Sequence, residues 1–364
     1  MLRVPNDDAR ALARRLRELR TAQFGRTVPQ SRLGAALGCS VPLISAWESM
    51  RGSAVPNEER LRAYAAFFST PRSLSGNGGS RLLPAAELTP AEAAERDRLE
   101  RELLALRAVA PAPAPRVFDP WRFRAGEPIR IVCPPVPGEK LQRMPHIDPR
   151  DPDHVALYRY GGLDALLELY GYLRAVNPDS PIEVRLASDM SAGDYVEHIV
   201  LLGGVDANGA TRYMIDQLHR SRRMPVRQES FADRADAGFV VGAERFRPVV
   251  VAAADAPRRG RLVEDVAHFY RGPNPLAVNR TVTICNAMYG RGVLGAALAL
   301  TRRGFRERNA GYLRSRFAGS SVVSVLSRVR VVRGQVLPPD WTSAADRLHE
   351  WAPAGLKPLR PIRG

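Results

Sequence analysis

Nineteen residues, from Gln30 to Glu48, constrain this chain more than any other stretch, because they read as two short helices joined by a tight turn. Gly38 follows the first helix pattern, where a helix favours a left-handed terminator. Ser40 precedes the second pattern, where a side-chain oxygen can cap free amides. The apolar stripes, at spacings of three and four residues, are Leu33, Ala36 and Leu37, then Leu43, Ile44 and Trp47. A turn this short predicts that the two helices cross steeply.

Two helices that cross in this way form a helix-turn-helix, whose second helix can lie in the major groove of DNA. The stretch resembles the DNA-binding domains of phage repressor and Cro-type (XRE-type) transcriptional regulators of the actinobacterial kind. The matching positions are Gln30, Leu33, Gly38, Ser40, Ile44, Ser45, Trp47 and Glu48. Pro29 replaces the usual capping Ser or Thr, and Gly34 the usual Ala, so we expect a less tight start to the first helix. A helical hairpin without a nucleic-acid partner is the alternative.

The resemblance implies which side chains face DNA. Gln30 would touch the DNA backbone. The residues early in the second helix that would face the groove are Val41, Pro42, Leu43, Ser45 and Ala46. Because most of these side chains are apolar, they suit thymine methyl groups rather than bidentate readout. We therefore expect backbone contacts and DNA shape to carry much of the affinity. The candidate DNA-binding residues are Arg26, Gln30, Arg32, Ser40, Val41, Pro42, Leu43, Ser45, Ala46 and Arg51.

The distribution of charge also bears on the partner. Formal net charge is +16, and arginine supplies nearly all of the positive charge, since Lys140 and Lys357 are the only lysines. Arginine with abundant alanine and proline is also typical of a GC-rich genome, so overall basicity alone decides little. Residues 1–82, however, hold 13 Arg against 6 Asp plus Glu, a difference of +7. A small basic domain attracts phosphate and releases counterions, so double-stranded DNA is the expected partner.

Cysteine use and hydropathy predict a cytoplasmic protein. Cys39, Cys133 and Cys285 are far apart, odd in number and without metal-ligand spacing. We therefore expect no disulfide framework, no metal site and no cofactor. No apolar run approaches the ~20 residues that a membrane span requires, so no membrane partner is expected.

Changes in composition divide the chain into parts. Its 364 residues suffice for two or three domains. We expect an all-α helix-turn-helix bundle over residues 1–70 and a linker over 71–127 that contains a charged helix at 89–109. Strand and helix patterns alternate over 128–345 and favour an α/β sandwich with a mixed sheet. We expect this part to be a ligand-sensing domain. A C-terminal tail covers 346–364.

The linker helix raises the question of oligomeric state. Thr89 with Glu92 is a capping-box pattern that starts this helix. Leu99, Leu103 and Leu106 follow a/d-like spacing over barely two heptads. The helix could pair between two chains or pack on its own second domain, and both alternatives stay open. A homodimer is expected.

Periodicity places the elements of the α/β domain. The expected strands are 129–133, 182–187, 198–202, 239–241, 249–252, 281–285 and 322–332. The expected helices begin near Leu163, at Asn208 and at Val293. Strand-to-helix turns in such a domain are where open sheets bind ligands.

Two glycine-rich turns follow strands in this domain. The first is LLGGVDAN over 201–208, and the second is ICNAMYGRGVLG over 284–295. In the second, the glycines match G-x-G-x-x-G and open a helix whose amides favour an anion, with a neighbouring arginine adding a charge-assisted contact. The candidate ligand-binding residues are Gly203, Gly204, Asp206, Asn208, Asn286, Gly290, Arg291 and Gly292.

Several interpretations of these turns are open. No acidic residue closes a second strand about twenty positions on, which argues against a nicotinamide-type dinucleotide. The glycines could also serve only tight turns and close helix packing. A small phosphate- or nucleotide-like effector is the interpretation we prefer, and the sequence then predicts an effector-controlled, sequence-specific DNA-binding transcriptional regulator.

An enzyme or stress effector with an autoregulatory helix-turn-helix is the rival prediction. Cys285 lies at a strand end, with His198 and His268 as available partners, but a buried cysteine more often acts as a small hydrophobe. No G-x-S-x-G, H-E-x-x-H or P-loop pattern occurs. Carboxylates for a hydrolase acting on a nucleotide or glycosidic bond are Glu197, Asp206, Glu264 and Asp265. No catalytic residue is assigned among these groups.

Overall fold

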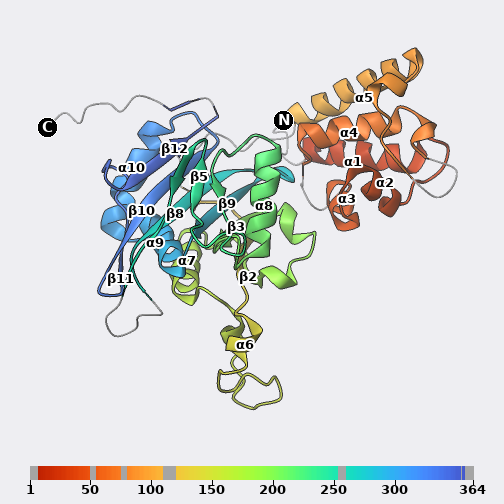
Figure 1. Ribbon diagram of the computed structural model, residues 1–364. Helices are drawn as coiled ribbons and strands as arrows, with labels where there is room; N and C mark the ends of the chain where they lie inside the picture. The colour runs from red at the N-terminus through yellow and green to blue at the C-terminus, as the bar shows by residue number, and fades with distance from the viewer. Residues whose placement is uncertain are drawn as a thin grey trace. The chain divides into compact units, whose positions relative to one another are not determined.

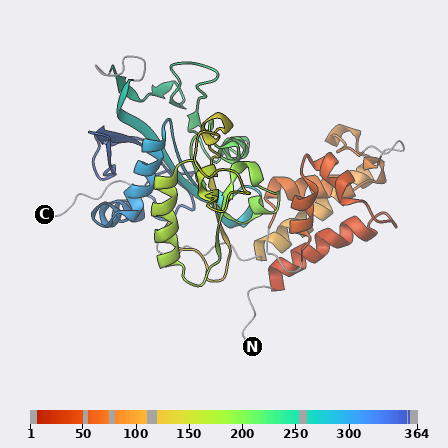
Figure 2. The ribbon, with the colours of Figure 1, turned by 90° about the horizontal axis from the view of Figure 1, so that it is seen from below.

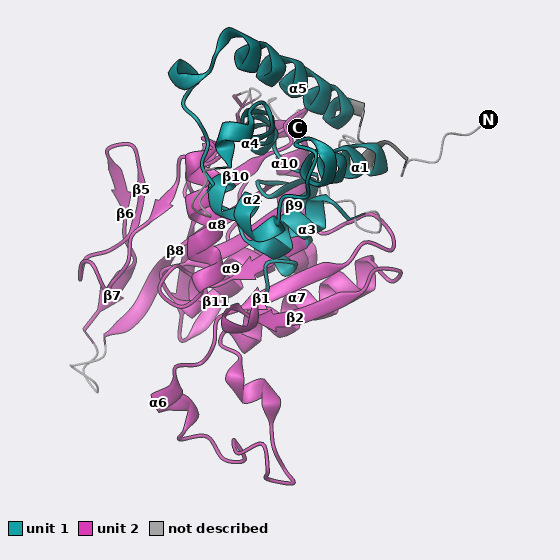
Figure 3. Cartoon of the chain, turned by 90° about the vertical axis from the view of Figure 1, so that its right-hand side faces the viewer, with its two compact units in different colours: residues 1–114, 191–197, 273–281 teal, residues 115–190, 198–272, 282–364 magenta. Residues whose placement is uncertain are grey.

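Two compact units make up the structure. The computed structural model describes residues 7–49, 55–74, 80–109, 120–252, 260–353 and 355–356, and Figure 1 labels its helices and strands. Unit 1 consists of Met1–Ala114, Ser191–Glu197 and Pro273–Thr281, whereas unit 2 consists of Pro115–Met190, His198–Gly272 and Val282–Gly364 (Figure 3). Helices occur together with a mixed sheet, so the expectation of a mixed α/β fold is confirmed.

Helices form most of unit 1. They include α1 (Asp7–Ala22), α2 (Gln30–Leu37), α3 (Val41–Trp47), α4 (Glu58–Phe68) and α5 (Pro90–Val109), with 3-10 turns at η1 (Pro71–Ser73), η2 (Ala85–Glu87) and η5 (Asp194–Val196). Apolar side chains at helical spacing face inward, and Leu16, Leu33, Ile44 and Leu61 are fully buried. Helices as short as α2 and α3 are unstable alone, so this burial holds them in place.

Helix α5 packs on α1 and α4 of the same unit. Its Leu99 and Leu103 side chains are fully buried, and Arg15 of α1 donates to Glu102 at 2.6 Å. The expected capping box is present, because the Thr89 amide donates to the Glu92 carboxylate at 2.8 Å. The linker helix thus takes neither expected place, since its apolar side packs on the N-terminal bundle.

A hairpin tip completes unit 1. The segment Pro273–Thr281, which connects strands β8 and β9, belongs to this unit. Trp47 at the end of α3 donates from Nε1 to the Leu276 carbonyl at 2.9 Å, in a buried position. Asn57, which also caps α4, donates from Nδ2 to the Pro275 carbonyl at 2.8 Å. Residues far beyond the predicted boundary at 70 are therefore part of the N-terminal unit.

A mixed sheet forms the centre of unit 2, in the order β11-β10-β8-β9-β3-β1-β2. The parallel strands are β1 (Ile129–Cys133), β2 (Ile182–Leu186), β3 (His198–Leu202) and β9 (Ala277–Ala287). The antiparallel strands are β7 (Val249–Val251), β8 (Arg261–Asn274), β10 (Val323–Val332), β11 (Gln335–Leu337) and β12 (Arg347–Trp351). A separate small sheet contains β4 (Arg227–Gln228), β5 (Phe239–Val241) and β6 (Glu244–Phe246).

Helices cover both faces of this sheet. Helices α7 (Leu163–Val176) and α9 (Gly290–Thr301) pack side by side on one face (Figure 2), and α10 (Arg303–Arg316) joins the same core. Val200 and Leu202 of β3 point into that core. Side chains alternate along a strand, so the equally buried Ile199 and Leu201 point to the other face, where α8 (Gly209–Arg220) contacts β3.

The remaining elements lie in the connections. They are α6 (Gly138–Leu141), η3 (Ala156–Arg159) and η4 (Ala187–Asp189). Of the expected elements, the strands at 129–133, 198–202 and 239–241 have the bounds that the sequence predicts. The 14-residue β8, α10 and the small β6 were not predicted, and β12 lies in the region expected to be a tail. Within the described part of the chain, no helix has both the length and the apolar character to span a membrane.

The burial of α5 generates a first prediction. Leu103→Ala removes a fully buried side chain from the contact with α1 and α4. We expect the free energy of unfolding of unit 1 to fall by ~2–5 kcal/mol, measured by denaturant titration of the full chain. Leu104→Ala, at a half-buried neighbour, is the matched control with a smaller loss. A Leu103→Ala chain that kept its stability but changed from dimer to monomer would show instead that α5 pairs two chains.

Candidate functional site

The turn between α2 and α3 is tight, and two glycines make it so. Gly38 ends α2 in the left-handed region, at φ 61°. A Cβ at Gly34 would lie 2.6 Å from the Cys39 carbonyl oxygen, so the turn folds back closely onto α2. Arg60 of α4 donates to the Leu37 carbonyl, which satisfies an acceptor at the helix end. Gly34 in place of alanine is therefore a requirement of this turn.

One face of α3 is exposed and the other is buried. Val41 is 40% exposed, Pro42 and Ser45 are also exposed, and Ala46 is half-buried. Leu43, in contrast, is only 4% exposed. The Leu43 side chain therefore packs inside unit 1. Contrary to the expectation, Leu43 is not among the residues exposed on this face.

The ends of the α2–α3 stretch are tied to α1 by a buried ion pair. Arg20 donates from Nε to both carboxylate oxygens of Glu48, at 2.7 and 2.8 Å. Gln30 donates to the same carboxylate at 3.0 Å, and Arg20 also reaches the Val28 carbonyl. Because Glu48 is 4% exposed, removing either partner would leave a buried charge uncompensated. Gln30 is thus already engaged by the protein.

The other expected DNA contacts lie at several places. Ser40 is exposed and occupies the N-cap position of α3, but its side chain makes no capping bond, contrary to the expectation. Arg26 is exposed, and Arg32 is half-buried. Arg51 lies outside the described residues. The exposed face of α3, Ser40 and Arg26 therefore remain as the accessible part of the predicted set.

The two glycine-rich turns of unit 2 are brought together by the sheet. They follow β3 and β9, which are adjacent parallel strands, and the Gly203 amide donates to the Cys285 carbonyl at 3.1 Å. A Cβ at Gly204 would lie 2.5 Å from the Ala287 carbonyl oxygen. Gln228 bridges the turns, donating to Ala287 at 2.9 Å. The first turn is consequently packed against the second.

The polar residues of the first turn bond within the protein. Asn208 is fully buried and caps α8 through the amides of residues 210 and 211. Asp206 accepts from Ser230 and from the Phe231 amide. Asn286 is buried and donates to Gln228 at 2.8 Å. These side chains hold the turns in place, which favours the packing interpretation for the Gly203–Asn208 turn.

A carboxylate of the chain itself fills the start of α9. Asp265 is fully buried and its Oδ2 accepts from the amides of Tyr289 and Gly292, both at 3.0 Å. A Cβ at Gly292 would lie 2.3 Å from this oxygen, so only glycine permits the approach. Burial raises the pKa of Asp265 to about 7, against the lowering effect of these amide donors. The inner part of the expected anion site is therefore occupied by Asp265.

A cavity of about 470 Å³ lies next to the same helix start. Helices α7 and α9 both begin at this cavity, and neither N-cap residue, Gly162 or Tyr289, supplies a side-chain cap. Gly290 and Arg291 are exposed here, and a Cβ at Gly290 would meet no atom within 4 Å. The lining residues are Gly162, Asp164, Ala165, Val250, Gly260, Leu262, Tyr289, Gly290 and Arg291. Of the predicted ligand residues, Gly290 and Arg291 line this cavity.

The structure does not assemble the catalytic groups considered from the sequence. Cys285 lies in the apolar core under α7 and α9, where burial raises the pKa of its thiol. His198 pairs with Glu127 at 2.8 Å, and burial lowers the pKa of His268 to about 3. Among the carboxylates, Glu264 pairs with Arg328. Cys285, His198 and Glu264 thus have structural roles of their own.

Sequence analysis missed one group of potential metal ligands. His146, Asp151 and Asp153 bring ligand atoms within 4.8 Å of one another in the loop after β1. His146 Nδ1 lies 2.9 Å from Asp151 Oδ2, and the Asp153 amide donates to Asp151 at 2.9 Å. These contacts account for the arrangement without an ion, so the group is assigned to the structure of the loop.

Comparisons with models of protein families, with curated proteins and with solved structures found no match to this chain.

The buried Asp265 generates a pH prediction. An acid with a pKa of about 7 when folded and 3.8 when unfolded holds its proton longer in the folded chain, so raising the pH through this window weakens folding. Between pH 3.8 and about 7, we expect the free energy of unfolding of the native chain to fall by up to ~4 kcal/mol relative to that of Asp265→Asn. Above this range the difference between the two chains should stay constant. Denaturant titrations at a series of pH values measure this difference. Parallel profiles for the two chains would contradict it.

Proposed function

We propose that this chain is a sequence-specific DNA-binding transcriptional regulator, in which α2 and α3 act as a helix-turn-helix and unit 2 binds a small phosphate- or nucleotide-like effector. The exposed face of α3 carries this proposal. Val41, Pro42 and Ser45 present small side chains there, while Leu43 and Trp47 anchor the opposite face. A short helix whose inner face is packed in the domain and whose outer face is exposed can enter a major groove.

The chemistry of this face favours DNA shape over base-specific hydrogen bonds. Val41 and Pro42 offer apolar contact, which suits thymine methyl groups, and Ser45 offers a single hydroxyl. Bidentate donors to guanine are absent from the exposed positions among residues 41–47, all of which the structure describes. Phosphate contacts from Arg26, together with the net positive charge of residues 1–82, would then supply much of the affinity.

The effector site that we propose is the unit 2 cavity. The start of α7, which no side chain caps, and the exposed Arg291 favour a phosphate group that binds outside Asp265. Val250 and Leu262 provide apolar lining for a base or sugar ring, and Asp164 can accept from a hydroxyl. A volume of about 470 Å³ lies in the range of small-molecule sites.

Regulation would require the effector to distinguish two states of the chain. We propose that two copies of the chain bind adjacent half-sites about one helical turn apart. An effector that binds one arrangement of the two copies more tightly shifts the population toward it. An effector with equal affinity for both arrangements would regulate nothing.

A charge placed on α3 tests the DNA-binding proposal. Ser45→Glu puts a carboxylate on the exposed face, where it would repel phosphate without entering the core. We expect its affinity for duplexes selected from a random pool by the native chain to fall at least ~10-fold, about 1.4 kcal/mol. Fluorescence anisotropy at fixed salt measures the change.

The matched control is Ala105→Glu, which places the same charge at an exposed position of α5. It should leave affinity within ~3-fold of native, since its site lies on a different helix. Equal losses for Ser45→Glu and Ala105→Glu, or failure of the native chain to select any duplex, would contradict the assignment of α3.

The cavity offers a matched pair of glycines. Gly290→Leu projects a side chain into open space, so it should block the cavity without loss of folding, whereas Gly292→Ala meets Asp265 and should destabilise the chain. Nucleotides and sugar phosphates would be screened by thermal unfolding of the native chain. A binder at a hundredfold excess over its dissociation constant should stabilise it by ~2.7 kcal/mol.

Gly290→Leu should lose the stabilisation that such a compound gives the native chain. If Gly290→Leu is still stabilised by the compound, the ligand binds elsewhere. If no phosphate compound stabilises the native chain, the effector part of the proposal fails.

A further inference from the structure

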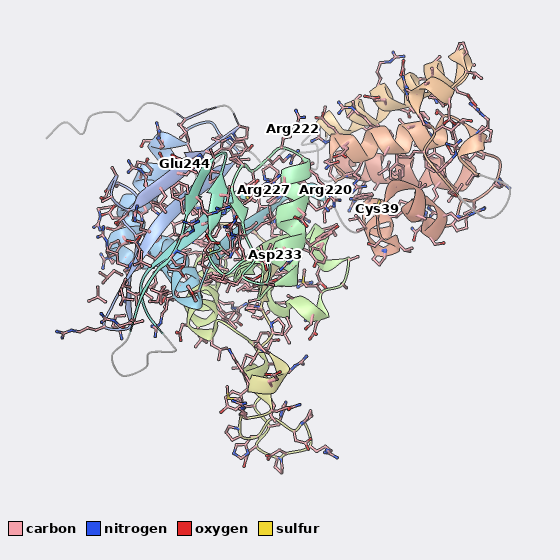
Figure 4. The ribbon with its side chains drawn as sticks, viewed as in Figure 1. Cys39, Arg220, Arg222, Arg227, Asp233 and Glu244 are labelled. Carbon is pink, nitrogen blue, oxygen red and sulfur yellow. The ribbon has the colours of Figure 1, made fainter. Side chains whose placement is uncertain are left out.

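Four arginines follow the middle of α8, in a stretch that Asp216 and Glu229 flank. Residues 217–228 contain Arg220, Arg222, Arg223 and Arg227 and no Asp or Glu. Arg220, Arg222 and Arg227 are exposed, and Figure 4 shows them around the same end of α8. We call these three side chains the α8 arginine cluster. It concentrates positive charge at one place on unit 2.

The cluster differs from its surroundings in its lack of ion pairs. Arginines nearby in the sequence do pair: Arg212 with Asp206, Arg234 and Arg247 with Asp236, and Arg245 with Glu229. Within the residues that the structure describes, no carboxylate forms an ion pair with a member of the cluster. Like charges held together without neutralisation repel one another, which suggests that an external anion completes this surface.

The end of α8 accounts for only part of this charge. Arg220 lies in the last turn, where a cation stabilises the helix dipole. Arg222 lies beyond the helix with φ at 52°, a conformation that favours glycine. Its amide closes the helix by donating to the His219 carbonyl at 2.9 Å. Helix capping alone would be served better by glycine than by arginine at this position.

A neighbouring histidine does not add to the charge. Burial lowers the pKa of His219, and the charge of Arg227 lowers it further. Figure 4 shows that Arg227, although it begins β4, lies near the last turn of α8. The cluster is therefore a set of permanent guanidinium charges whose number does not change near neutral pH.

We propose that the α8 arginine cluster is a second phosphate-contacting surface, on unit 2, that binds the backbone of double-stranded DNA. The proposal rests on the proposed DNA-binding function. The aliphatic side chains of this stretch are buried: Leu218 is 0%, Met224 3% and Val226 1% exposed. The surface thus lacks the apolar core of a protein interface and the apolar face of a membrane-surface helix. Contacts to DNA phosphates require only charge and hydrogen-bond donors.

The salt dependence of DNA binding gives the decisive measurement. Each phosphate neutralised contributes ~0.9 to the slope of log affinity against log salt concentration. R220Q/R222Q/R227Q in the full chain should lower this slope by ~2–3. It should also lower the affinity for native-selected and for random-sequence duplexes by the same factor. The control, R150Q/R247Q/R303Q, removes three exposed, ion-paired arginines of unit 2. It loses the same net charge and should change the slope by less than ~1.

The outcomes separate this proposal from the DNA-binding proposal. If the cluster variant keeps the native slope while Ser45→Glu still weakens binding, the cluster does not contact DNA, and the function of α3 stands. Equal slope changes in the cluster and control variants would show that net charge alone is measured, which overturns the proposal. Failure of the native chain to bind any duplex would overturn both. Unchanged melting temperatures of the two triple variants show that folding is intact.

Discussion

The buried hydrogen bond from Trp47 Nε1 to the Leu276 carbonyl is the contact on which unit 1 depends. Trp47 ends α3, so this bond fixes one end of the helix that carries the exposed face. The amide of Val278 donates to Val55 at 2.8 Å and strengthens the same contact. A buried indole N–H without an acceptor would cost ~1–3 kcal/mol. The N-terminal bundle therefore uses a hairpin tip encoded some two hundred residues later, and a boundary near residue 70 would cut through its hydrogen bonds.

Asp265 has a comparable role in unit 2. Its carboxylate satisfies amides at the start of α9 that would otherwise be open to an anion. The glycine motif thus serves two purposes. Gly292 permits the approach of Asp265, and Gly295 permits that of Val329, whose Cγ1 would lie 2.4 Å from an added Cβ. Gly290, with no atom near its Cβ, faces the cavity instead. An external phosphate must accordingly bind outside Asp265, toward Arg291.

The elements predicted well from sequence are those in which one local pattern dominates. Strands β1 and β3 are short, mostly apolar and almost entirely buried, and their bounds agree with the sequence prediction. Strand β8 was missed because Asp265, His268 and Arg271 interrupt its apolar pattern. All three are buried, and partners distant in sequence satisfy them, such as Thr283 for Arg271 at 2.8 Å. A single sequence shows the polar residues of such a strand but cannot show the partners whose hydrogen bonds compensate for burying them.

The same limit explains which site residues could be identified. Gly290 and Gly292 are equivalent in the motif, and only the position of Asp265 distinguishes a cavity-lining residue from a packing residue. In unit 1, periodicity gives the inward face of α3, yet Leu43 was assigned outward because the resemblance, not burial, placed it. With few base-reading groups on α3, specificity would come from DNA shape and affinity from arginines elsewhere. Selectivity and salt sensitivity of binding would then reside in different residues of the chain.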